Sequence, residues 1–170
     1  MKIKDLRNEL KNLSNEEKDS LIIDLFKTFK DVKRFLDIKH SAESKDILFE
    51  EVREKIKKEF DLKYINSRWR FSVVKSNIWN YKKVSWDIHW TIRLYIFYLK
   101  VLLNFMSEVW NWEQLSDAFY NSFNQTVKLI NAWWYWEEFI KDMKIICNWT
   151  EGYWWWVDAV YDLLNDIKLN

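Results

Sequence analysis

Apolar residues recur three to four positions apart through most of the chain, and this spacing is what most restricts its fold. Leu48, Val52 and Ile56, for example, follow one another four residues apart. Such spacing places side chains on one face of an α-helix. No segment shows the alternating pattern and paired turns that strands require. The sequence therefore predicts an all-α fold, a single compact multi-helix domain over residues 1–170.

An N-terminal helical hairpin is predicted over residues 1–40, followed by a helical core over residues 44–170. Ser14 and Glu17 have the spacing of a capping box, so a helix begins after Ser14. The core face predicted for this helix consists of Leu21, Ile22, Leu25, Phe26 and Phe29.

A long central helix is predicted from Ile88 to Val109, with Asp87 as its N-terminal cap. Ser72 is predicted to cap a shorter helix before it. Three further helices are expected near residues 113–131, 136–147 and 155–167. Arg93 and Lys100 interrupt the apolar run of the long helix, which favours a buried helix over a membrane span.

Composition indicates a folded protein of a reducing compartment. The chain is 49% hydrophobic and 31% charged, and its only cysteine is Cys147, so no internal disulfide can form. The first residues do not resemble a secretory signal. We therefore expect a cytoplasmic protein.

Glycine and tryptophan depart from ordinary usage in opposite directions. The chain has one glycine, Gly152, no proline and 13 tryptophans, where about a dozen glycines are usual for this length. Several tryptophans stand where helices should stop, which are glycine positions. These are Trp69, Trp110, Trp154 and Trp156. One hypothesis is that UGA codons meaning glycine were translated as tryptophan; the rival is a tryptophan surface that stacks on bases or sugars.

No set of residues typical of an active site converges in the sequence. Two distant histidines and one cysteine do not form a metal-ligand pattern, and no phosphate-binding loop is present. Asp87 and His89 match a helix cap beside a surface histidine better than a catalytic pair. We expect no metal, no cofactor and no enzymatic activity.

Polar residues form a stripe on the otherwise apolar central helix. His89, Arg93, Lys100 and Asn104 lie at offsets that place them on one face. Two interpretations remain open. The stripe is either the solvent-facing edge of a core helix or the floor of a groove for an anion or a partner.

Charge is segregated along the chain. Residues 53–83 hold ten basic against three acidic side chains, whereas residues 107–170 hold four against ten. The basic stretch can face acidic helices of the same chain, a second copy or a protein partner, or it can bind nucleic acid. The candidate binding residues are Arg68, Arg70, Lys75, Lys82, Lys83, His89, Arg93 and Lys100. We expect a non-catalytic protein-interaction or regulatory module; the alternative is a nucleic-acid-binding module built on residues 53–83.

Three motifs resemble a bacterial family of unknown function, domain-of-unknown-function family 6155. They are the opening Leu6-x3-Leu10-x2-Leu13-Ser14-x-Glu16-Glu17, then Val32-Lys33-x-Phe35-Leu36, and Phe119-Tyr120-Asn121-Ser122. At the turn some ten residues before the last motif, the family pattern is similar to Tyr-Gly-Asp, whereas this chain has Val109-Trp110-Asn111. The resemblance implies a helical domain and no known activity, so it transfers no catalytic residues.

Overall fold

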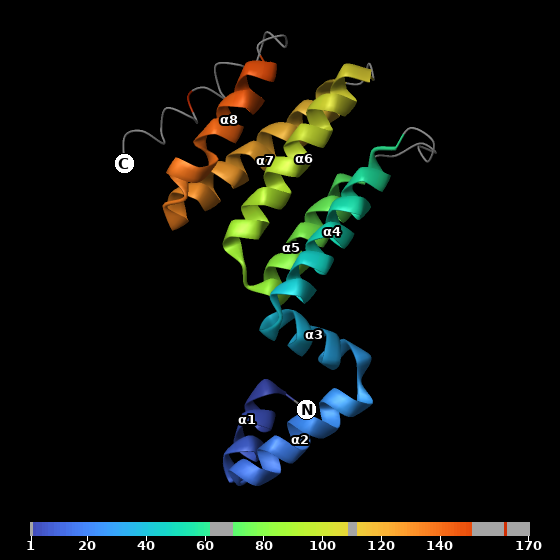
Figure 1. Ribbon diagram of the computed structural model, residues 1–170, viewed down its shortest axis with the longest axis vertical. Helices are drawn as coiled ribbons and strands as arrows, with labels where there is room; N and C mark the ends of the chain where they lie inside the picture. The colour runs from blue at the N-terminus through green and yellow to red at the C-terminus, as the bar shows by residue number, and fades with distance from the viewer. Residues whose placement is uncertain (1, 62–69, 109–111, 151–161, 163–170) are drawn as a thin grey trace. The chain divides into compact units, whose positions relative to one another are not determined.

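In the structure, a computed structural model, helices are the only regular secondary structure of the described residues (Figure 1). These are residues 2–61, 70–108, 112–150 and 162. Eight helices and no strand are present in these ranges. The all-α class is therefore confirmed, while the helix predicted near residues 155–167 lies outside the described part of the chain.

The chain divides into two compact units, residues 1–45 and residues 46–170. The first contains α1 (Ile3–Asn12), α2 (Asn15–Thr28) and α3 (Lys30–His40). The prediction that residues 1–40 and 44–170 belong to a single domain stays a prediction.

Helix α2 begins as its sequence predicts. The Ser14 hydroxyl accepts a hydrogen bond from the backbone N–H of Glu17 at 3.1 Å, and the Glu17 carboxylate accepts one from the N–H of Ser14 at 2.7 Å. This reciprocal pair is a capping box. Phe29 ends α2 and is also the N-terminal boundary residue of α3.

The core face predicted for α2 is not buried within the N-terminal unit. Leu21, Ile22, Leu25 and Phe29 are exposed, and neither α1 nor α2 contains a buried residue. Helical spacing reports that a helix has an apolar face, but that face becomes core only where another element packs along it.

The second unit contains most of α4 (Ala42–Glu59), then α5 (Phe71–Ser85), α6 (Ile88–Glu108), α7 (Trp112–Trp133) and α8 (Trp136–Thr150). Helix α6 contacts α5, α7 and α8, so it is the central helix of this unit (Figure 1). Helix α4 joins this packing through its buried residues Phe49, Val52 and Ile56. The ring of Phe60, the residue that follows α4, lies 5.4 Å from that of Phe105 and 5.8 Å from that of Tyr98.

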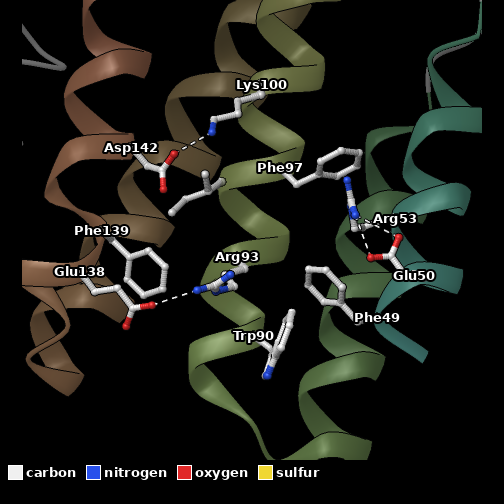
Figure 2. Close-up of a pocket in the computed structure, with 11 residues that line it drawn as sticks. Phe49, Glu50, Arg53, Trp90, Arg93, Phe97, Lys100, Glu138, Phe139 and Asp142 are labelled. Atoms are coloured by element: carbon white, nitrogen blue, oxygen red, sulfur yellow. Dashed lines mark hydrogen bonds and ion pairs between the residues drawn. The ribbon is translucent and has the colours of Figure 1, made fainter. Parts of the chain in front are cut away.

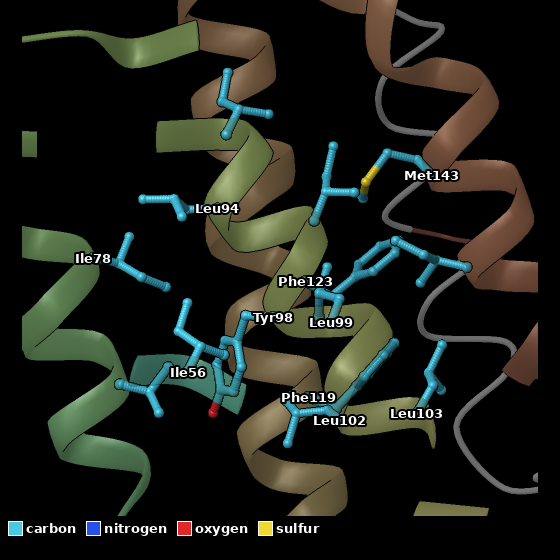
Figure 3. Packing of buried hydrophobic residues seen from close by; sticks show 14 of the residues in the cluster. Ile56, Ile78, Leu94, Tyr98, Leu99, Leu102, Leu103, Phe119, Phe123 and Met143 are labelled. Carbon is cyan, nitrogen blue, oxygen red and sulfur yellow. The ribbon is translucent and has the colours of Figure 1, made fainter. Parts of the chain in front are cut away.

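Central position explains the composition of α6. Ten of its residues are buried, and its side chains meet those of α4, α5, α7 and α8 in one hydrophobic core (Figure 3). Leu115, Phe119 and Phe123, four residues apart on α7, are fully buried in this core. Met143 of α8 is fully buried there too. The core therefore fixes which sides of α4, α6 and α8 remain accessible.

The N-terminal caps predicted for α5 and α6 have different outcomes. Asp87 caps α6 as predicted, because its carboxylate accepts a hydrogen bond from the N–H of Trp90 at 3.1 Å. The predicted cap of α5 is wrong: the helix begins at Phe71 with Arg70 at the cap position, so Ser72 lies inside it. The ring of Phe71 packs 6.1 Å from that of Phe60, and this packing brings Phe71 into the helix.

Among the described residues, no helix combines the length and the apolar character needed to cross a membrane. This holds for α6, where Arg93 and Lys100 are exposed.

Candidate functional site

A cleft of about 380 Å³ runs along α6, with α4 on one side and α8 on the other (Figure 2). We call it the α4–α6–α8 cleft. Aromatic rings and charged groups of both signs line it. The lining residues are Phe49, Glu50, Arg53, Trp90, Arg93, Ile96, Phe97, Lys100, Glu138, Phe139 and Asp142.

Two ion pairs connect the floor of the cleft to its α8 side. Arg93 donates to the Glu138 carboxylate at 3.1 Å, and the Lys100 ammonium donates to that of Asp142 at 2.7 Å. All four side chains are roughly half-exposed. Lys100 follows Arg93 along α6, and its partner Asp142 follows Glu138 along α8, so α6 and α8 run parallel. Exposed pairs of this kind stabilise a fold by only about 0–1 kcal/mol, so their partners can be exchanged at small cost.

The α4 side of the cleft is built from Arg53 and aromatic rings. The Arg53 guanidinium lies 4.6 Å from the centre of the Phe97 ring and donates to both carboxylate oxygens of Glu50, at 2.7 and 2.9 Å. The rings of Phe49 and Trp90 meet edge to face at 4.5 Å. Stacking on rings holds a guanidinium in place while its edge stays available for hydrogen bonds.

His89 lies beside Glu138, not beside Asp87 in the manner of a catalytic pair. Its Nε2 is 2.6 Å from the Glu138 carboxylate, which also accepts from Arg93. The hydrogen bond from His89, together with the one from Arg93, lowers the pKa of Glu138. Asp87 instead caps α6. The arrangement therefore favours the ionised form of Glu138, and the carboxylate partner of His89 is Glu138 and not Asp87.

The predicted polar stripe and the predicted basic stretch have different outcomes. Two residues of the stripe, Arg93 and Lys100, line the cleft. His89 forms a hydrogen bond with Glu138, which also lines the cleft, and Asn104 is exposed. The stripe is thus both a solvent-facing edge and the floor of a groove.

The basic stretch is spread over separate surfaces. Arg53 enters the cleft, whereas Lys55 and Lys58 line a hollow on α4 that also contains Glu51 and Glu54. Lys82 and Lys83 lie beside the ring of Trp79.

Arg70 and Lys75 also lie away from the cleft. Arg70 makes a two-pronged ion pair with Glu59, at 2.9 and 3.0 Å. Lys75 is a half-buried residue of α5, and Arg68 lies outside the described residues, as do Trp69, Trp110, Gly152, Trp154 and Trp156.

Of the charged and aromatic residues that line the cleft, sequence reasoning named only Arg93 and Lys100 as candidates. Arg53 was counted only in the charge of residues 53–83. The spacing of Glu138 and Asp142 could have revealed them. They stand four residues apart, on one face of α8, and can face cations seven residues apart on α6. In the described residues, no group of three or more His, Cys, Asp or Glu side chains is placed to hold a metal ion.

Comparison with known families bears on this geometry. The model of a family of unknown function, DUF6155, matches residues 1–166. The chain belongs to DUF6155. No curated protein and no solved structure matches it. The function of this DUF6155 protein therefore has to be argued from its own residues.

Proposed function

We propose that this DUF6155 protein is a non-catalytic interaction module that binds a segment of a partner protein in the α4–α6–α8 cleft. The observation that carries the proposal is the cleft itself, where accessible ion pairs alternate with aromatic rings. Tryptophan and arginine dominate the binding energy of many protein interfaces, and Trp90, Arg53 and Arg93 all line this cleft.

The balance of charge favours a protein over a nucleic acid. Three cations line the cleft, and each has a carboxylate within 3.1 Å. A phosphate backbone binds by neutralising cations and releasing counterions, and here it would have to displace those carboxylates. A protein segment with both acidic and basic side chains can form ion pairs with both members of each pair, so no charge is left alone.

Binding would combine an apolar anchor with an exchange of ion pairs. An apolar side chain of the partner would pack against Phe97 and Phe139, which lie on opposite sides of Arg93 and Lys100 in Figure 2. A partner carboxylate would then bind Arg93, and a partner cation would bind Glu138. Each new pair would be more shielded from water than the existing pair, which makes its contribution larger.

A photo-crosslinking amino acid at position 97 tests this proposal in cells that express the protein. We expect one protein species to be crosslinked from position 97 and not from position 145, an exposed site on α8 outside the cleft. Arg93→Glu should abolish the product, while Lys144→Glu, with the same change in charge on exposed α8 surface, should not.

The double variant Arg93→Glu with Glu138→Arg separates binding from folding. It restores an intramolecular ion pair with reversed polarity, so a purely structural role predicts that crosslinking returns. The proposed role predicts that it does not. Equal crosslinking from positions 97 and 145, or a crosslink to nucleic acid, would contradict the proposal; a crosslink to a second copy would identify self-association as the interaction.

Two accompanying expectations belong to the same proposal. We propose a cytoplasmic location because the sequence has one cysteine, Cys147, and so lacks the internal disulfides that are common in oxidising compartments. Nucleic-acid binding through residues 53–83 stays a prediction; a salt-dependent affinity that is lost with Arg70→Glu and Lys75→Glu would support it.

A further inference from the structure

Two non-glycine residues have a left-handed backbone in the described chain, and both are tryptophans. Trp86 has φ 55° and ψ 22°, and Trp134 has φ 59°. In this region the Cβ atom of an L-residue approaches the following carbonyl oxygen too closely. Glycine, which has no Cβ, enters it freely, whereas a bulky residue there is an outlier.

Position 86 is the left-handed residue of a helix C-terminal motif. Helix α5 ends at Ser85, and the N–H of Trp86 donates to the carbonyl of Lys82 at 3.1 Å. That single bond, from the left-handed residue to the carbonyl four residues earlier, is the bond of the αL motif. Asp87 then caps α6. A glycine followed by an aspartate is the usual chemistry of so short a connection between helices.

Position 134 has the equivalent place in a Schellman motif. The N–H of Tyr135 donates to the carbonyl of Ile130 at 3.2 Å, and the N–H of Trp134 donates to that of Asn131 at 3.4 Å. These two bonds enclose a left-handed residue after the end of α7, a position usually taken by glycine. Two different motifs thus require the same residue type.

Burial does not compensate for the backbone strain at these tryptophans. Their side chains are 72% exposed at position 86 and 80% exposed at position 134. Trp90 is the contrasting case: it lies within α6, is partly buried, and packs against Phe49 with Arg93 5.2 Å from its ring.

We propose that residues 86 and 134 are glycines in the protein made by its own organism, because the gene has UGA codons at both positions and that organism reads UGA as glycine rather than tryptophan. The composition agrees, since the chain has 13 tryptophans and one glycine. The backbone geometry selects which tryptophans are affected, and it leaves Trp90 as a true tryptophan.

This assignment changes a surface that otherwise resembles a stacking platform. Trp79, Lys82, Lys83, Trp86, Ile88 and Trp133 line a hollow of about 370 Å³. Aromatic rings beside lysines are typical of single-strand nucleic-acid binding. Glycine at position 86 removes one of the three rings that line the hollow, so the natural protein has less stacking surface there.

Mass spectrometry of the protein isolated from its own organism tests the assignment directly. Trypsin cleaves after Lys83 and Arg93, so one peptide, residues 84–93, contains both position 86 and position 90. We expect glycine at 86 and tryptophan at 90 in that single peptide, and glycine at 134 in the peptide of residues 129–141. Tryptophan at position 86 or position 134 would overturn the proposal at that position.

Unfolding of the recombinant chain with tryptophan at these sites provides an independent measurement. Trp86→Gly and Trp134→Gly should each decrease the unfolding equilibrium constant by about fivefold, because each relieves left-handed strain. The control Trp90→Gly should increase it, because glycine within a helix is unfavourable and the contacts of the indole are lost. An unchanged or increased constant for Trp86→Gly and Trp134→Gly would refute the argument from strain.

Discussion

Removing the cap of α6 should destabilise the protein by a predictable amount. Asp87 accepts a hydrogen bond from the N–H of Trp90 at 3.1 Å and places a carboxylate at the start of the central helix. Losing such a cap costs about 0.5–2 kcal/mol, and part of that loss is the favourable interaction of the negative charge with the helix dipole, about 0.3–1 kcal/mol. We therefore expect Asp87→Ala to lower the free energy of unfolding by about 1–2 kcal/mol.

Asp87→Asn separates the two contributions, because the amide oxygen keeps the acceptor but carries no charge. It should cost about 0.3–1 kcal/mol, less than the alanine variant. For a chain of this size, each kcal/mol corresponds to about 2–4 °C in Tm. Urea and thermal unfolding followed by far-ultraviolet circular dichroism measure both variants. An alanine variant as stable as the parent, or an asparagine variant as unstable as alanine, would refute the reasoning.

Two further predictions concern Glu138 and Cys147. Because the pKa of Glu138 is lowered in the folded state, its carboxylate stabilises the fold above the ordinary value of 4.5, and this stabilisation disappears as the pH falls through the lowered pKa. The difference in free energy of unfolding between the parent and Glu138→Gln should therefore shrink below pH 4.5, and a difference that grows on acidification would contradict this. Burial raises the pKa of Cys147 to about 12, so alkylation by iodoacetamide near neutral pH should be negligible in the native protein and rapid in urea. Equal alkylation rates in both conditions would show that the thiol is not buried.

Local chemistry accounts for the parts of the fold that the sequence predicted. The capping box at Ser14 and the cap at Asp87 depend only on residues three positions apart, so both could be predicted from the sequence alone. The same holds for the helical faces that include Val52 and Ile56, which are buried. The prediction that Ser72 caps α5 failed because the position of a cap also depends on where packing starts the helix. Here the ring of Phe71 packs against that of Phe60, and Phe71 is the first residue of α5.

The left-handed tryptophans show how closely sequence and backbone depend on each other. Chain composition pointed to glycine positions, but the places chosen from the sequence lie outside the described residues. Trp86 carried a signal that was not used: it stands between one predicted helix and the Asp87 cap of the next. The backbone dihedral angles distinguish Trp86 and Trp134, which are left-handed, from Trp90, which is helical.

The sequence by itself determined that the chain is helical, where two of its helices begin, and that α6 has one polar stripe, because each of these depends on neighbours within about one helical turn. Tertiary structure alone decided what that stripe faces. The stripe meets Glu138 and Asp142 of α8 and lies beside Arg53 of α4, side chains some 40 residues away in either direction. It also decided that the apolar face of α2 is not covered within the N-terminal unit. An amphipathic pattern specifies a face to be covered, whereas the identity of the covering element depends on how all the helices pack together.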